Sequence, residues 1–231
     1  MKDEILDIIL SKKSHREKFI LATEINTGKQ IFINEKSEDI SIKKILESAE
    51  ELLDLGQSGL ININKSPWFI NVSLPPLRLV IVGAVHIAQP LAKIASTTGY
   101  EVTIIDPRSA FANDKRFPNI RIINEWPEEA LIDYNIDNRT AIVTLTHDPK
   151  LDDSALNAAI KSDAFYIGSL GSKKTHNARI NRLLLANHKQ TDIDRIHGPV
   201  GLPIGAKSPD EIAISIMSEI VKTLHEIKRQ K

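Results

Sequence analysis

Residues 77–108 combine, in order, an apolar run, a glycine turn, a helical pattern, a second apolar run and an acid. The first run is Leu79–Val82, and it leads directly into Gly83. The second run, Val102–Ile105, ends at Asp106. Two short apolar runs separated by a helical pattern predict parallel strands joined by a helical crossover, because parallel neighbours need a long connection. This unit constrains the fold more than any other part of the chain.

The rest of residues 77–231 repeats the alternation of strand and helix. Such alternation predicts an open, mostly parallel sheet with helices on both faces, a Rossmann-like α/β fold. The expected strands are residues 78–82, 101–105, 120–123, 140–145 and 164–167. The expected helices are residues 86–98, 127–132, 152–161, 173–186 and 209–228.

Residues 1–76 predict a separate, small α+β domain. Its expected strands are residues 19–25, 30–34, 60–63 and 68–72, and its expected helices are residues 4–10 and 40–55, the second ending at Gly56. Pro75 and Pro76 disfavour both helix and ladder pairing, so they mark the boundary between two domains. We therefore expect domains at residues 1–76 and 77–231.

Composition narrows the classes of partner. Lysine plus arginine equals aspartate plus glutamate at 30 each, so the chain has no basic field that would attract nucleic acid or an anionic membrane. No apolar run approaches the roughly 18 residues of a membrane span, and Met1–Glu4 does not resemble the start of a secretory signal. We expect a cytoplasmic protein whose partners are small molecules and other proteins. The chain has no cysteine, which excludes disulfides and thiolate chemistry, and we predict no metal site.

The turn after the first strand departs from the dinucleotide fingerprint G-x-G-x-x-G/A. Gly83 and Ala88 fit its first and last positions, but Val85 replaces the middle glycine. That glycine allows the backbone to approach a pyrophosphate closely, so we expect Val85 to obstruct one. His86, at the start of the following helix, can donate to a bound anion, although a solvent-facing histidine is the commoner case.

Polar residues also follow the second and fourth strands. Asp106 stands where an acid normally accepts from ribose hydroxyls, and Arg108 can instead face a phosphate; alternatively, Asp106 caps a turn. His147 and Asp148 are candidates for an acid-base pair at the end of the fourth strand. We interpret the next acids, Asp152 and Asp153, as helix caps.

The segment 168–176 provides the sharpest local signal for an anion site. Glycines, hydroxyls and lysines meet there at the start of a helix, and the predicted ligands are Gly168, Ser169, Gly171, Ser172, Lys173 and Thr175. The alternative is a serine-glycine turn capped by Ser172. A stiff loop at residues 198–209, with Gly201 and Gly205, is expected to form a second contact with a phosphate or a heterocycle, or to be structural only.

Several motifs in the same order resemble the XdhC/CoxI family of accessory factors for molybdenum hydroxylases. They are Gly83-Ala84-x-His86-Ile87-Ala88, Ile105-Asp106-Pro107-Arg108, Arg116-Phe117-Pro118, Thr146-His147-Asp148-Pro149-Lys150, Tyr166-Ile167-Gly168-Ser169-Leu170-Gly171-Ser172 and Gly201-Leu202-Pro203-Ile204-Gly205-Ala206. The resemblance implies a chaperone that binds the molybdenum cofactor, a pterin dithiolene with a terminal phosphate, rather than an enzyme. It also implies a xanthine dehydrogenase-like client, a cysteine desulfurase as a second partner, and a homodimer.

The chain departs from the family in its N-terminal region. Members usually carry a longer N-terminal domain with a cysteine near a glycine pair, and residues 1–76 contain no cysteine. Cofactor binding is therefore expected to rest on the Rossmann-like domain.

Two other functions stay open at this point. One is an NAD(P)-dependent oxidoreductase, with Asp106 or Arg108 on the ribose and His147 as general acid. The other is a nucleotide-sensing regulatory domain.

Overall fold

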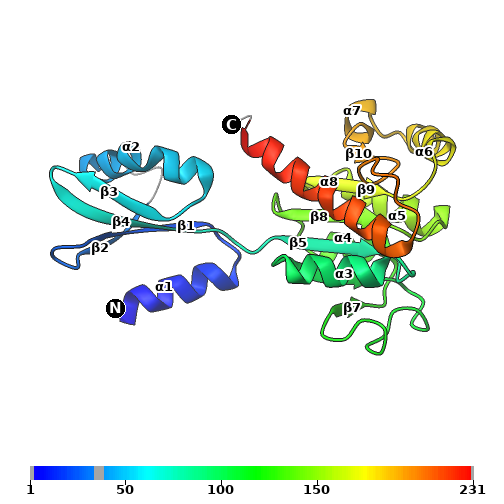
Figure 1. Ribbon diagram of the computed structural model, residues 1–231, viewed down its shortest axis with the longest axis horizontal. Helices are drawn as coiled ribbons and strands as arrows, with labels where there is room; N and C mark the ends of the chain where they lie inside the picture. Colours follow the sequence, from blue (N-terminus) through cyan, green and yellow to red (C-terminus); the bar gives the residue numbers. More distant parts are fainter. Residues whose placement is uncertain (1–2, 34–38, 230–231) are drawn as a thin grey trace. The chain divides into compact units, whose positions relative to one another are not determined.

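A computed structural model describes residues 3–33 and 39–229 (Figure 1). The chain divides into two compact units, the N-terminal unit Met1–Pro75 and the C-terminal unit Pro76–Ile227. No helix in the described ranges is both long and apolar enough to cross a membrane.

The N-terminal unit packs helices with one antiparallel sheet of strand order β2-β1-β4-β3. Its elements are α1 (Asp3–Ser14), β1 (Phe19–Glu24), β2 (Gln30–Ile33), α2 (Ile40–Leu55), β3 (Gly59–Ile63) and β4 (Ser66–Ser73). The predicted hairpin pairs Ile20 with Ile33, while its expected last residue, Asn34, lies outside the described residues. Helix α2 ends as expected at Gly56, which adopts φ +63° and donates its amide to the last turn.

The C-terminal unit contains a parallel six-stranded sheet of order β10-β9-β8-β5-β6-β7. Its strands are β5 (Arg78–Val82), β6 (Glu101–Ile105), β7 (Arg121–Ile123), β8 (Thr140–Thr144), β9 (Tyr166–Ser169) and β10 (Ile196–His197). The chain starts in the middle at β5, runs outward through β6 and β7, and returns to the other side of β5 with β8. This order confirms the predicted Rossmann-like fold and places its switch point between β5 and β8.

Helices cover both faces of this sheet. They are α3 (Ala88–Thr97), α4 (Pro127–Asp133), α5 (Pro149–Ala159), α6 (Lys173–Leu185), α7 (Gln190–Ile193) and α8 (Pro209–Arg229). Every residue of β5 is buried, and alternate side chains point to opposite faces. Leu79 packs in one apolar cluster with residues of α3 and α8, whereas Val80 packs in another with residues of α4 and α5. Figure 1 shows α3 and α8 on the nearer side of this sheet.

Some helices and strands begin at other residues than predicted, where a capping side chain or a short stretch of strand pairing determines the first residue. Helix α5 begins at Pro149, three residues early, because Asp148 caps it. Helix α3 begins at Ala88 rather than at residue 86, and β9 begins at Tyr166 rather than at residue 164. Helix α7 and strand β10 were not predicted, since segments of four and two residues carry no periodicity.

A buried arginine fixes the amino end of β5. Arg78 is 6% exposed and donates to Oγ1 of Thr140 at 3.1 Å and to the carbonyl oxygen of Asn135 at 2.8 Å. It also pairs with Asp137 at 3.1 Å, and its guanidinium lies 4.7 Å from the ring centre of Tyr134. One side chain thus joins β5 to β8 and to the turn that precedes β8.

Replacing this arginine should destabilise the C-terminal unit. We expect Arg78→Met to lower the free energy of unfolding by about 3 kcal/mol, because it leaves buried acceptors without a donor. Urea unfolding in a Trp68→Phe background, where Trp126 alone reports, measures the change. Arg121→Met is the matched control, since exposed Arg121 stacks on the same tyrosine ring at 5.6 Å. Equal losses in both variants would contradict the assignment.

Candidate functional site

Parallel strands bring most of the predicted site residues to one edge of the sheet, the edge where the strands' carboxyl ends lie. Gly83 follows β5, Asp106 follows β6, His147 follows β8, and Ser169 is the last residue of β9. The predicted residues Gly201 and Gly205 lie in the loop after β10.

The turn after β5 is crowded by the loop after β8. Gly83 adopts φ +106°, and a Cβ built on it would lie 2.6 Å from Cγ2 of Thr146. The side chain of Val85 is half-buried and packs against the apolar core. Thr146 therefore requires glycine at position 83, while the side chain of Val85 is directed into the core. His86 is exposed.

The carboxylate of Asp106 is fully used within the protein. It is 1% exposed, and Oδ2 accepts from the amide of Ala84 and from Nη2 of Arg108, both at 2.8 Å. Oδ1 accepts from the amide and from Nε of Arg108, at 3.0 and 2.8 Å. A carboxylate offers about four acceptor positions, so a ribose hydroxyl would have to displace Arg108 or Ala84. Burial alone would raise the pKa of Asp106, but these hydrogen bonds outweigh it and hold the pKa below its ordinary value.

Arg116 holds the other side of the same turn. Its Nη1 donates to the carbonyl oxygens of Ala84 at 2.6 Å and Phe111 at 2.8 Å, and its Nη2 donates to Oε1 of Gln89 at 3.2 Å. Both backbone groups of Ala84 are therefore bonded to side chains of the protein. The motif Arg116-Phe117-Pro118 was noted in the sequence without a role, since nothing local indicates that its arginine reaches a turn 32 residues earlier.

In the loop after β8, the acid predicted to belong to the site is a helix cap, and the acids predicted to be caps are not. Asp148 caps α5 by accepting from the amide of Lys150 at 2.9 Å. Asp152, predicted to be a cap, is 2% exposed and instead accepts from the amide and hydroxyl of Thr146, at 3.1 and 2.6 Å. The capping prediction for Asp153 is also wrong, since its carboxylate pairs with Arg182. A residue far outside the loop determines that pairing.

His147 is exposed, with φ +62°. A left-handed backbone is uncommon for a residue other than glycine, so this loop is held in a sparsely populated conformation.

The segment 168–176 has the predicted helix start, but its hydroxyls differ in access. Ser172 caps α6 and accepts from the amide of Thr175 at 3.1 Å. Ser169 is fully buried, and its Oγ lies 2.5 Å from Oγ1 of Thr144. Lys173 is exposed in the first turn of α6. The accessible part of this candidate site is thus the helix start rather than the end of β9.

Two glycines in this segment are required by packing. A Cβ on Gly168 would lie 2.5 Å from Cγ2 of Val200, so a side chain there would push away the loop after β10. Gly171 adopts φ +150°, and a Cβ on it would lie 3.0 Å from Cβ of Thr175.

A partly buried polar cluster supports the loop after β10. The hydroxyl of Tyr166 and the amide of Gly201 both donate to Oε2 of Glu219, at 2.6 and 2.8 Å. Nδ1 of His197 lies 3.5 Å from Oε1 of Glu219, and its ring stacks on Tyr166 with centres 4.7 Å apart. Gly201 has φ +94°, and a Cβ there would collide with Ser215, while Gly205 faces open space. No local pattern indicated this cluster, since its acid is 53 residues from its tyrosine.

Burial alone would raise the pKa of Glu219, but hydrogen bonds from His197, Tyr166 and Gly201 outweigh burial and lower it. Burial, reinforced by Glu219, raises the pKa of the Tyr166 hydroxyl, which therefore stays protonated as a donor.

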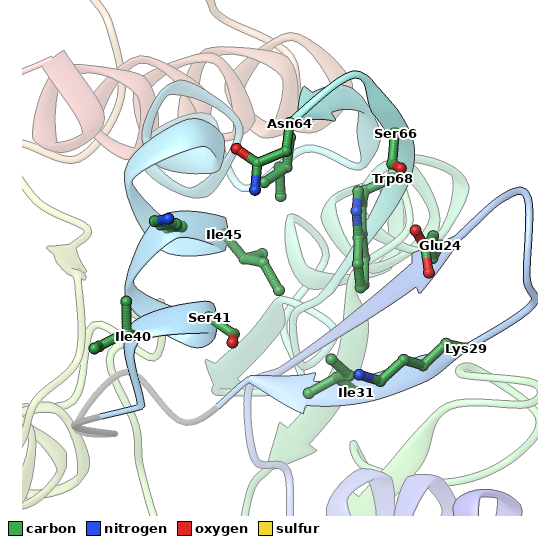
Figure 2. Close-up of a pocket in the computed structure, with 11 residues that line it drawn as sticks. Glu24, Lys29, Ile31, Ile40, Ser41, Ile45, Asn64, Ser66 and Trp68 are labelled. Atoms are coloured by element: carbon green, nitrogen blue, oxygen red, sulfur yellow. The ribbon is translucent and has the colours of Figure 1, made fainter.

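Cavities also lie away from the strand ends. A groove of about 870 Å³ runs between α3, residues 116–120 and the start of α8, and its lining includes His86 and Arg116. A pocket of about 270 Å³ lies in the N-terminal unit (Figure 2). Its lining combines apolar side chains such as Trp68 with the polar side chains of Lys29 and Glu24. Within residues 3–33 and 39–229, no three His, Asp or Glu side chains are arranged to hold a metal ion.

Comparison with known proteins identifies relatives of the C-terminal unit. Residues 79–220 match the family model of the XdhC Rossmann domain. A Bacillus subtilis protein, described as a probable subunit of xanthine dehydrogenase, is 35% identical over 156 residues, which are 67% of this chain and 45% of that protein. The molybdenum cofactor insertion chaperone PaoD of Escherichia coli is 31% identical over 155 residues, 66% of this chain and 42% of that protein. The chain thus spans less than half the length of these curated relatives.

A solved structure shares the fold. The crystal structure described as a xanthine dehydrogenase from Bacillus halodurans superposes with a TM-score of 0.71 at 24% identity, covering 96% of this chain and 64% of that one.

The cluster around Glu219 generates a pH-dependent prediction. Because the folded-state pKa of Glu219 is below the ordinary 4.5, its stabilisation is present above about pH 4.5 and is lost as the pH falls through the folded-state value. We expect Glu219→Gln to lower the free energy of unfolding by about 2 kcal/mol at pH 7, with the difference from wild type shrinking at about pH 4.

Urea unfolding of the Trp68→Phe background at the two pH values measures this difference. Glu226→Gln on the same helix is the control, since Glu226 forms an exposed pair with Lys222 at 3.7 Å and should contribute little at either pH. A difference for Glu219→Gln that stays constant between the two pH values would disprove the role of the carboxylate charge.

Proposed function

We propose, because this chain belongs to the XdhC family, that it is a maturation factor for molybdenum hydroxylases of the xanthine dehydrogenase type. In this role it binds the molybdenum cofactor and delivers it to the client enzyme. The names of the two curated relatives, one an insertion chaperone for this cofactor and the other a component of xanthine dehydrogenase, support the role. The cofactor is cargo, so the protein itself turns nothing over.

The hydrogen bonding of Asp106 favours the molybdenum cofactor over a pyridine nucleotide as the ligand. Its four hydrogen bonds come from Ala84 and Arg108, so it offers no free acceptor to a ribose. The same turn is crowded by Thr146 at Gly83. An adenosine ribose would therefore have to break existing contacts at its usual position.

The start of α6 suits the phosphate end of the cargo. The first amides of a helix have no intrahelical acceptor, and the helix dipole favours an anion there. Lys173 and Lys174 add two exposed positive charges in the first turn.

Because the chain has no cysteine, the sulfur that binds molybdenum must come from the cofactor itself and from a partner such as a cysteine desulfurase. Such a partner and a homodimer are part of the proposal.

Ligand titration tests the choice of cargo. Purified protein is titrated anaerobically with molybdenum cofactor freshly released from a molybdoenzyme, and separately with NADH and NADPH, while tryptophan fluorescence is followed. We expect saturable micromolar binding of the cofactor and no saturable binding of either nucleotide in the same range. Micromolar NADH or NADPH binding without cofactor binding would instead establish the oxidoreductase alternative.

The two lysines of α6 should contribute to cofactor affinity. We expect Lys173→Ala/Lys174→Ala to weaken cofactor binding on the order of tenfold at low salt, and less at high salt, because exposed charges are screened. Lys161→Ala/Lys222→Ala removes the same charge from exposed positions elsewhere in the C-terminal unit and is the matched control. Equal affinities of the two double variants would remove the start of α6 from the site.

A further inference from the structure

A buried arginine in α6 lacks partners for most of its donors. Arg179 is 2% exposed, and its Nη2 donates to the carbonyl oxygen of Leu170 at 2.8 Å. Nε and Nη1 are also buried, and neither has a hydrogen-bond partner among the described residues. A guanidinium carries five N–H donors, and an unpaired buried donor is costly. Arg179 therefore keeps a set of donors that no group in the described part of the chain satisfies.

The positive charge of Arg179 also lacks a direct counter-ion. No carboxylate in the described part of the chain forms an ion pair with it: Asp153 pairs with Arg182, and Asp152 accepts from Thr146. Burial lowers the pKa of Arg179, while Asp152 and Asp153 oppose this effect from beyond ion-pair distance. An anion at this position would supply both the missing acceptors and the missing charge.

The guanidinium lies close to the two residues that precede the cap of α6. Its Nη2 contacts the carbonyl of Leu170 and lies 3.7 Å from a Cβ built on Gly171. The free amides at the start of α6 and the side chain of Lys173 border the same loop. Arginine, helix start and lysine thus surround one short segment, residues 170–173.

We propose that Arg179 is the ligand that recognises a phosphate monoester in this loop. One phosphate oxygen accepts from Nε or Nη1 of Arg179, and a second accepts from Nη2 once the carbonyl of Leu170 releases that group. The first amides of α6 donate to the remaining oxygens. A planar guanidinium matches two phosphate oxygens at once, which an ammonium does not. This inference rests on the proposed function, in which the monoester is the terminal phosphate of the cofactor, and names the residue that reads it.

Inorganic phosphate is a sufficient probe, and the full chain can be used without any cofactor. In the ¹⁵N-labelled protein, phosphate should shift the Nε–H resonance of Arg179 saturably, and that of Arg182 much less. We expect Arg179→Met to weaken phosphate binding at least about tenfold and Arg179→Lys to weaken it less, because lysine keeps the charge and loses the fork. Arg182→Met, one turn later on the same helix, removes an equal charge and should change the affinity less than about twofold.

The outcomes separate this inference from the proposed function. If phosphate leaves the Arg179 resonance unmoved in the wild-type chain, or binds Arg179→Met as tightly as wild type, the inference fails. The resonance test needs no variant, so it holds even if Arg179→Met does not fold. If phosphate binds through Arg179 but the molybdenum cofactor is neither bound nor delivered, the inference stands and the proposed function fails.

Discussion

The carboxylate of Asp106 is the interaction on which the rest of the candidate site depends. By accepting from Ala84 and twice from the side chain of Arg108, it ties the turn after β5 to the loop after β6. Arg116 binds the opposite side of the same turn, and Thr146 packs against it from the loop after β8. Three neighbouring loops are thereby held by side chains at the point where other proteins of this fold place a dinucleotide.

The polar groups that lack partners lie on the other half of the sheet, near the loop after β9. The acid after β6 has all its acceptors filled, whereas Arg179 beneath the loop after β9 has donors without acceptors. A binding site needs unsatisfied groups, because a ligand gains little by competing with contacts that the protein already makes. Under the proposed function, the same parallel sheet binds a phosphate-bearing cargo through α6 rather than a dinucleotide between β5 and β6.

The sequence predicts the parts of the structure that local pattern determines. Strand β5 is predicted to the residue because the apolar run Leu79–Val82 leads into a glycine, and α2 because its apolar spacing ends at Gly56. The alternative that Asp106 caps a turn is confirmed by the amide of Arg108, two residues later. Contacts between distant residues leave no such pattern, so the bond from Ala84 to Asp106, the partners of Glu219 and the burial of Ser169 were not predicted. Arg179 has the least local signal, since an arginine within a helix is usually solvated.

These contacts change the interpretation of the valine that replaces the middle glycine of the fingerprint. Taken alone, Val85 predicts a steric block, yet its side chain packs against the core while the turn itself is fixed by Asp106, Arg116 and Thr146. A turn whose amide and carbonyl are already bonded has no need for a glycine that admits a pyrophosphate. The turn after β5 thus joins three loops through Asp106, Arg116 and Thr146, which is consistent with the proposal that the ligand binds at the start of α6 instead.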